Sequence, residues 1–313
     1  MKHFLPFLCL IFLLTGCQKP IDEASDTRFL MDTVCTIVAG GGNANGALQE
    51  AFDAVKEIQD AVNRFDENST VARFNRAKAG EAVALDRHTA SILKTALAVS
   101  KASGGAFDIT IAPASSLWDF HAENPIPPSE ESMKQVLALI GYDKLILDTD
   151  KSTLTKTQDG VAIDLGGAAK GYAADYAAEV LRQAGLDYAL LNFGGNVYVF
   201  GKNPNHKDGS WQVGIQKPFA DSGRYSRTIS IAEGAVVTSG IYQRNFTYDD
   251  KLYHHILDPK TGYPTDGALA GVTIQADSAL LADCLSTACL VLGEEQGKAV
   301  ATSFDTLLYA EKK

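Results

Sequence analysis

The alternation of strand-like and helix-like segments along most of the chain limits its fold class more than any other feature. Apolar and β-branched runs typical of strands lie near residues 29–39, 144–148, 161–165, 188–193, 196–200, 211–216, 228–232, 270–275 and 306–310. Apolar residues at helical spacing lie near residues 48–65, 88–102, 133–140, 169–184, 278–292 and 295–303. We therefore expect an α+β fold of mixed or antiparallel sheets with packed helices, including a hairpin that turns at Gly194-Gly195. No linker interrupts residues 29–313, so we expect a single domain there.

Composition and charge restrict the kind of partner. Hydrophobic residues make up 46% of the 313, which excludes an intrinsically disordered chain. The sequence has 38 Asp and Glu against 28 Lys and Arg, a net charge of −10, and no run of basic residues. Nucleic acid is therefore not an expected partner, because phosphate backbones are bound by basic patches. A negatively charged ligand would need a metal ion or a helix N-terminus.

Residues 1–16 are expected to be a signal peptide. Lys2 precedes an apolar stretch, residues 4–14, that is too short to span a bilayer and suits a secretory leader. The following Leu14-Thr15-Gly16-Cys17 resembles the bacterial lipobox, in which cleavage before the cysteine leaves it lipidated. Residues 17–28 would then be a tether, and the protein an exported lipoprotein anchored in a bacterial membrane and facing the periplasm. An ordinary leader with a chance cysteine is the alternative, and the sequence does not choose between inner and outer membrane.

The other cysteines do not form a disulfide framework. Of five cysteines, Cys9 leaves with the leader and Cys17 would carry lipid, so Cys35, Cys284 and Cys289 remain. Because three is an odd number, we expect buried thiols. The sequence contains neither CxxC nor HExxH, which argues against the usual zinc and thiol-redox sites.

Residues 161–171, VAIDLGGAAKG, predict an apolar strand that enters a helix through Gly166-Gly167. Such a turn presents unpaired backbone N–H groups and the positive end of the helix, which together suit an anion such as phosphate. Lys170 in the first helical turn would add positive charge. A tight connection without a ligand is the alternative.

Asp283 and Thr287 lie four residues apart, so they share one face of the predicted helix. A carboxylate and a hydroxyl are hard oxygen ligands that suit Mg²⁺, which keeps positions for water and for a substrate phosphate. In the alternative, Thr287 bonds back to a helix carbonyl and Asp283 lies at the surface. The helix is apolar almost all round, so we expect Asp283 to be partly buried, and an unpaired charge there would be costly.

His254 and His255 are adjacent, and neighbouring residues of a strand face opposite sides. At most one of them is therefore expected to reach a given site. A histidine within reach of a hydroxyl could act as a general base, whereas a structural histidine is the alternative. The sequence after them, Asp258-Pro-Lys-Thr-Gly262, predicts a turn.

These three stretches belong to an ordered set that resembles the ApbE-type FAD:protein FMN transferases. The other members of the set are Met31-Asp32-Thr33, residues 69–75 (STVARFN), residues 105–110 (GAFDIT), residues 192–196 (NFGGN) and Thr238-Ser239-Gly240. The resemblance extends in order from about residue 29 to residue 293. It implies an ApbE-like, T-fold-like flavin transferase architecture.

The resemblance also implies an activity: Mg²⁺-dependent transfer of FMN from FAD to a Ser or Thr hydroxyl of an acceptor flavoprotein, with release of AMP. The acceptor segment in such systems resembles Ser/Thr-Gly-Ala-Thr and belongs to subunits of respiratory redox complexes. Two alternatives remain. The same site could hydrolyse FAD to free FMN and AMP, or the protein could be a non-catalytic FAD-binding lipoprotein.

Carried over residue by residue, the family pattern assigns roles within the site. Asp283 and Thr287 would bind Mg²⁺ through their side chains, Gly167 would bind it through its carbonyl, and His255 would deprotonate the acceptor hydroxyl. The residues expected to line the FAD site are Met31, Phe65, Ala106, Phe107, Asp108, Asp164, Lys170 and Ile256. Phe65 stands where some relatives have tyrosine, which preserves aromatic packing but removes a hydroxyl.

Overall fold

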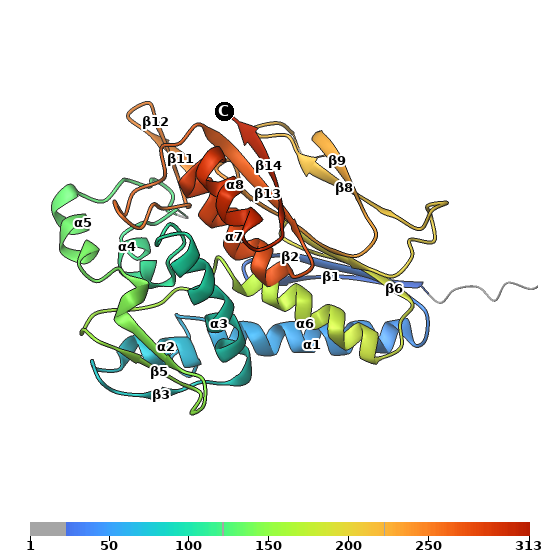
Figure 1. Cartoon of the computed structure of the whole chain (residues 1–313), viewed down its shortest axis with the longest axis horizontal. Coiled ribbons are helices and arrows are strands. Elements are labelled where there is room, and N and C mark those ends of the chain that lie inside the picture. The colour runs from blue at the N-terminus through green and yellow to red at the C-terminus, as the bar shows by residue number, and fades with distance from the viewer. Residues whose placement is uncertain (1–22, 121, 222) are drawn as a thin grey trace, which may run out of the picture.

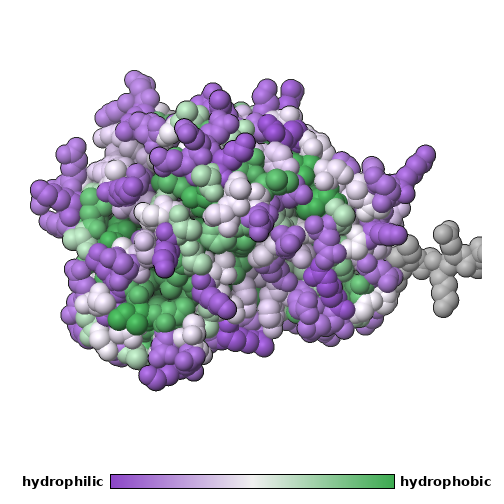
Figure 2. All heavy atoms as spheres, viewed as in Figure 1, coloured by the Kyte–Doolittle hydropathy of each residue, from purple (hydrophilic) through white to green (hydrophobic). Residues whose placement is uncertain are grey.

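The structure is a computed structural model that describes residues 23–120, 122–221 and 223–313, and it confirms an α+β fold (Figure 1). The predicted signal peptide and Cys17 lie outside the described residues. Among the residues that are described, no helix combines the length and the apolar character needed to cross a bilayer. On the face shown in Figure 2, hydrophilic side chains dominate the outline and hydrophobic ones gather in separate patches.

A seven-stranded sheet with the order β1-β2-β6-β7-β10-β13-β14 forms the centre of the fold. Its strands are β1 (Glu23–Leu30), β2 (Thr33–Gly40), β6 (Tyr188–Phe193), β7 (Asn196–Phe200), β10 (Gly234–Gly240), β13 (Leu269–Ala276) and β14 (Leu307–Lys312). Neighbouring strands of this sheet pair antiparallel throughout. The smaller sheets are β3 (Val83–Ala84) with β5 (Thr153–Lys156) and β4 (Leu145–Asp148), β8 (Trp211–Gln216) with β9 (Tyr225–Ile231), and β11 (Asn245–Tyr248) with β12 (Lys251–His254).

Helices cover one face of the large sheet, where Figure 1 shows α1 and α6 side by side. The helices are α1 (Ala44–Val62), α2 (Thr70–Arg76), α3 (Arg87–Ala102), α4 (Ala112–Ser115), α5 (Glu130–Leu137), α6 (Ala169–Gln183), α7 (Ala279–Leu292) and α8 (Glu294–Thr302), with short 3₁₀ turns η1 (Ile109–Ile111) and η2 (Tyr142–Lys144). The predicted amphipathic pattern is confirmed in α1, whose buried side includes Leu48, Phe52 and Val55.

The two faces of the large sheet carry separate cores because side chains alternate along a strand. On β10, Ala235 and Val237 belong to the main core under the helices, whereas Val236 belongs to a second core. The β8–β9 hairpin closes that second core with Trp211 and Ile229. The expected hairpin at Gly194-Gly195 is confirmed by the antiparallel pairing of β6 with β7.

The prediction of one strand over residues 29–39 is wrong. β1 and β2 form a hairpin that turns at Met31 and Asp32, both in the left-handed region with φ of 53° and 57°. Positive φ at both central residues is typical of a type I′ turn, which matches the twist of the flanking strands. Residues 23–28, expected in a tether, form most of β1.

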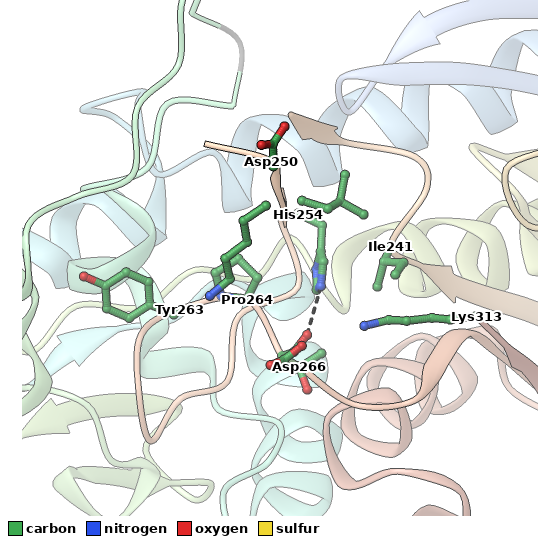
Figure 3. A pocket seen from close by; sticks show the side chains of 10 residues that line it. Ile241, Asp250, His254, Tyr263, Pro264, Asp266 and Lys313 are labelled. Carbon is green, nitrogen blue, oxygen red and sulfur yellow. Dashed lines mark hydrogen bonds between the residues drawn. The ribbon is translucent and has the colours of Figure 1, made fainter. Parts of the chain in front are cut away.

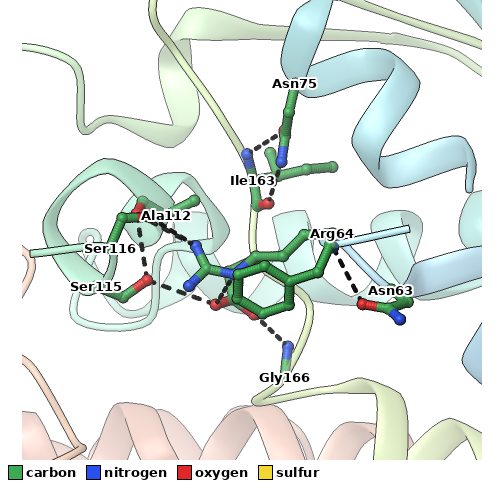
Figure 4. Close-up of polar contacts among 10 residues, drawn as sticks. Asn63, Arg64, Asn75, Ala112, Ser115, Ser116, Ile163 and Gly166 are labelled. Carbon is green, nitrogen blue, oxygen red and sulfur yellow. Dashed lines mark hydrogen bonds and ion pairs between the residues drawn. The ribbon is translucent and has the colours of Figure 1, made fainter. Parts of the chain in front are cut away.

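Residues 161–165 are not a strand either, although Ile163 is buried as a strand residue would be. The Asn75 side chain takes the place of a neighbouring strand: its Nδ2 donates to the Ile163 carbonyl at 3.0 Å and its Oδ1 accepts from the Ile163 N–H at 2.7 Å (Figure 4). The Asp164 N–H donates to the carbonyl of Ile109 at 2.8 Å. The backbone groups of this segment are therefore satisfied without a ladder.

Lys156 holds the start of the same segment. Its side chain is buried at 1% exposure, and its ammonium donates to the carbonyls of Asn75 at 3.0 Å and Val161 at 2.7 Å. The ammonium also lies 5.1 Å from the centre of the Phe74 ring. Burial lowers the Lys156 pKa, and the two carbonyls compensate the buried donor groups.

The position of Phe65 and the strand β10 also differ from the prediction. α1 ends at Val62, so Phe65 lies beyond the helix and is 83% exposed, although it was expected on the helical face. β10 was not predicted, because its sequence GAVVTSG begins and ends with glycine and has no simple alternation.

Candidate functional site

The first turn of α6 meets α7 at Asp283. The Gly171 N–H donates to Asp283 Oδ2 at 2.9 Å, and the Lys170 ammonium lies 3.9 Å from the same oxygen. Lys170 also donates to the carbonyl of Gly166 at 3.2 Å. Asp283 is only 4% exposed, so the expectation of a partly buried carboxylate is confirmed and the surface alternative is wrong.

Gly171 allows the two helices to touch backbone to backbone. A Cβ atom at this position would lie 2.2 Å from the carbonyl oxygen of Ala279 and 2.8 Å from the Cβ of Asp283. Any larger residue would separate α6 from α7. Sequence reasoning included Gly171 in the glycine-rich stretch but did not assign it this role.

Thr287 lies one turn further along α7 and faces the double-glycine corner. Its Oγ1 shares a hydrogen bond of 3.1 Å with Ser239 Oγ on β10, and a Cβ atom at Gly167 would lie 3.8 Å from the same Oγ1. Ser286 bonds back to the Asp283 carbonyl, whereas Thr287 is directed at Ser239. The structure therefore brings Gly167, Asp283 and Thr287 together, as expected.

Asp164 fixes the other side of the glycine corner through Gly166, Arg64 and Ser115, which Figure 4 labels. Its Oδ1 accepts from the Gly166 N–H at 2.8 Å, and its Oδ2 lies 3.4 Å from Arg64 Nε and 3.5 Å from Ser115 Oγ. The Arg64 guanidinium lies 4.6 Å from the centre of the Phe65 ring. Arg64 had no signal in the sequence, because its partner lies a hundred residues away.

His255 follows the end of β12 and is half-buried. Its backbone N–H and its Nδ1 both lie near the Arg244 carbonyl, at 3.1 Å and 3.3 Å. Nδ1 therefore carries the proton in the neutral ring, and Nε2 is left as the acceptor. Burial lowers the His255 pKa to about 4. The Arg244 side chain reaches the β1–β2 turn, where it pairs with Asp32 at 2.8 Å.

His254 points the other way, as two adjacent strand residues should. It is 2% exposed, and its Nε2 lies 3.1 Å from the Thr265 carbonyl. Burial lowers its pKa to about 4. It lines a cavity of about 280 Å³ together with Asp250, Asp266 and Lys313 (Figure 3). This cavity includes none of the residues expected at the site. Of the two histidines, His254 is therefore the structural one.

The remaining residues expected to line the FAD site fall into two groups. Phe107 borders the glycine corner, since its ring lies 3.1 Å from a Cβ atom placed at Gly167, and Ala106 and Ile256 are buried. Asp108 is buried, and its oxygens accept from the N–H groups of Thr110 and Tyr142, which makes it a support of the loop. Burial raises the Asp108 pKa.

Met31 lies in the β1–β2 turn, where its N–H donates to Gln59 Oε1 at 2.6 Å. The turn is therefore held against α1 on one side. On the other side it is held by Arg244, whose Nη2 donates to the Asp32 carbonyl at 2.9 Å. These contacts place Met31 on the same side of the molecule as His255.

The oxygens at this site fit a small, hard cation such as Mg²⁺. The Asp283 carboxylate and the Thr287 hydroxyl lie one turn apart on α7, and Gly167, whose carbonyl is the third expected ligand, lies beside Thr287. Within the described part of the chain no three His, Cys, Asp or Glu side chains form a metal-binding group. A bound cation would therefore take its remaining ligands from water or from an anionic substrate.

Comparisons with known proteins agree with the fold and identify the family. The chain is 31% identical over 308 residues to the FAD:protein FMN transferase of Vibrio cholerae, which covers 96% of this chain and 91% of that protein. It is 35% identical over 246 residues to a protein of the same name from Klebsiella pneumoniae, and this match covers 79% of this chain and 75% of that protein.

Solved structures are similar over almost the whole chain. The crystal structure of the ApbE protein of Thermotoga maritima has a TM-score of 0.83 at 33% identity, with 92% of this chain and 94% of that chain covered. The flavin transferase ApbE of Vibrio cholerae has a TM-score of 0.80 at 27% identity, with 93% of this chain and 98% of that chain covered. A sequence model of the ApbE family matches residues 31–309. This chain belongs to the ApbE family.

Proposed function

We propose that this protein is an FAD:protein FMN transferase that moves FMN from FAD to a Ser or Thr hydroxyl of an acceptor flavoprotein and releases AMP. The observation that carries the proposal is the meeting of Asp283 and Thr287 with the Gly166-Gly167 corner at the start of α6. The names of the similar proteins support the choice of reaction.

The site compensates the negative charge of a diphosphate, which a protein of net charge −10 does not attract by itself. Lys170 and the N-terminus of α6 supply positive charge beside the corner. Asp283, Thr287 and the Gly167 carbonyl would hold Mg²⁺. When bound, the ion would neutralise charge on the diphosphate and on the departing AMP.

The transfer replaces the phosphoanhydride bond of FAD with a phosphoester bond to the acceptor hydroxyl. The acceptor oxygen attacks the FMN-side phosphorus, the bond from that phosphorus to the bridging oxygen breaks, and AMP leaves with that oxygen. The hydroxyl proton passes to Nε2 of His255, which is neutral at physiological pH because burial lowers its pKa to about 4. A bound diphosphate would raise this pKa toward the working pH.

The test is mass spectrometry of a peptide that carries Ser/Thr-Gly-Ala-Thr, incubated with the protein, FAD and Mg²⁺. We expect a mass gain of one FMN, and no gain in a matched peptide in which the acceptor residue is alanine. FMN and AMP without labelled peptide would indicate an FAD pyrophosphatase instead. Tight FAD binding without Mg²⁺-dependent turnover would indicate a flavin-binding protein and refute the proposal.

The location of the protein is a separate proposal. We propose that Cys17 carries acyl chains that anchor the protein to a bacterial membrane on the periplasmic side, where a respiratory redox complex could supply the acceptor. The lipobox-like Leu14-Thr15-Gly16-Cys17 is its support. Replacement of Cys17 by serine should release the protein from the membrane fraction, and persistent membrane association would contradict the anchor.

A further inference from the structure

Asp175 on α6 binds the N-terminus of α7, the helix that carries both side chains expected to bind the metal. Its Oδ1 accepts from the Ala279 N–H at 2.7 Å. Its Oδ2 accepts from the Leu280 N–H at 3.0 Å and from the Ser278 hydroxyl at 2.7 Å. One carboxylate thus satisfies two of the N–H groups that the first turn of a helix leaves unpaired.

Asp283 makes the reverse contact. It belongs to α7 and accepts from the Gly171 N–H, which lies in the first turn of α6. Each helix therefore places a carboxylate against the N-terminal N–H groups of the other. Two such contacts in opposite directions fix both the axial position and the rotation of α7 relative to α6.

We propose that Asp175 is a positioning residue that sets α7 so that Asp283 and Thr287 face the Gly167 corner. The inference rests on the proposed function, because it concerns the metal site of that reaction. Ala279, Asp283 and Thr287 are spaced by four residues and lie on one face of α7, so a contact at the first fixes the other two. A slip of one residue would move their oxygens by about 1.5 Å and turn them by about 100°.

A carboxylate is needed at position 175 for a geometric reason. Three donors converge on its two oxygens. Asparagine would keep one acceptor oxygen, but its NH₂ group would face a donor where Asp175 has an acceptor. Asp175→Asn is therefore a small change in shape that opposes the contact. Glu179→Gln is a matched control, because Glu179 lies one turn further along α6, is exposed and accepts a hydrogen bond from the nearby Gln183 side chain.

The experiment compares the wild type, Asp175→Asn and Glu179→Gln as purified proteins. We measure the KM for Mg²⁺ in FMN transfer, the Mg²⁺-induced rise of Tm in the presence of FAD, and hydrogen exchange at the Gly171 amide. Asp175→Asn should raise the KM for Mg²⁺ at least about tenfold, weaken the Mg²⁺-induced rise of Tm and speed exchange at Gly171. FAD binding measured without Mg²⁺ should stay unchanged, and Glu179→Gln should behave as wild type.

The outcomes separate positioning from stability alone. A lower Tm with a wild-type KM for Mg²⁺ would overturn the inference, because Asp175 would then act only as a helix cap. A wild type without Mg²⁺-dependent transfer would refute the proposed function, and exchange at Gly171 would then decide the inference by itself. If Asp175→Asn does not fold, Ser278→Ala removes one of the three bonds, together with the bond that Ser278 Oγ accepts from the Leu281 N–H. It should raise the KM for Mg²⁺ by a smaller factor, and an unchanged value would overturn the inference.

Discussion

Gly171→Ala tests the contact on which the proposed site depends. The added methyl group would lie 2.2 Å from the carbonyl oxygen of Ala279 and 2.8 Å from the Cβ of Asp283. Ordinary contacts between such atoms begin near 3.5 Å, so α7 would have to move by about 1 Å. The obstacle is backbone, so a rotamer change of a side chain cannot relieve it.

Two opposing contributions set the size of the effect. Helix propensity alone favours alanine over glycine by about 0.5–1 kcal/mol. Overpacking of a tight interface costs about 1–3 kcal/mol and should prevail here because the clash involves main-chain atoms. We expect a net loss of about 1–2 kcal/mol, which corresponds to a fall in Tm of about 2–3 °C for a chain of this size. A shift of about 1 Å at the site should lower the transfer rate by about a hundredfold.

The assay pairs thermal unfolding with the rate of FMN transfer to the acceptor peptide. Gly267→Ala is the control, because the nearest atoms to its added methyl group would be Thr265 Oγ1 at 3.9 Å and the Leu290 carbonyl oxygen at 4.0 Å. That variant should keep its Tm and its rate. A Gly171→Ala protein that is as stable and as active as wild type would show that α6 and α7 are not in backbone contact.

Three further predictions concern ionisable residues of the site and its neighbour. Asp283→Asn keeps an oxygen for the Gly171 N–H but loses the charge, so it should leave Tm nearly unchanged and abolish Mg²⁺-dependent transfer; a near-normal rate would contradict the metal assignment. His255→Ala should lower kcat by about 10²–10⁴-fold with little change in the Kd for FAD, whereas an unchanged kcat would exclude His255 as the base. His254 has a pKa of about 4 when folded and 6.5 when unfolded, so below pH 6.5 the unfolded chain binds a proton that the folded protein excludes. The free energy of unfolding should therefore fall by up to about 3 kcal/mol as the pH is lowered from 6.5 to 4. His254→Gln should flatten the dependence of Tm on pH in that window. The same slope in the variant and the wild type would contradict this role of His254.

Most helices could be predicted because their local signals and their packing agree. In α3 the apolar spacing is preceded by Asp86, whose carboxylate accepts from the His88 and Thr89 N–H groups, and it is followed by Gly104-Gly105. Strands such as β6 and β7 were also predicted, since a glycine turn separates them. In these elements the sequence nearby decides the structure.

The errors occur where a distant side chain decides the structure. Residues 161–165 have the composition of a strand, but their backbone pairs with the Asn75 side chain. No local sequence pattern predicts that contact. The turn at Met31 and Asp32 contains no glycine, and its contact with Arg244 joins residues far apart in the chain.

The site follows the same rule. The spacing of Asp283 and Thr287 predicted a shared helix face, the glycine-rich stretch predicted an anion-binding corner, and the resemblance joined the two into one site. The contact of Asp164 with Arg64 and that of Asp175 with the start of α7 depend on tertiary packing, so the sequence alone could not predict them.

The course of β1 bears on how the protein would meet its acceptor. The strand begins at Glu23 and ends beside the Met31–Asp32 turn, which Arg244 connects to His255. Its 8 residues span about 26 Å, so the chain joins the sheet at the end remote from His255. If Cys17 is anchored in lipid, the anchored segment would join the sheet at this remote end. An acceptor threonine would then have to reach a site that lies about that far from the point of attachment, as one on a long aqueous loop or a domain of its complex could do.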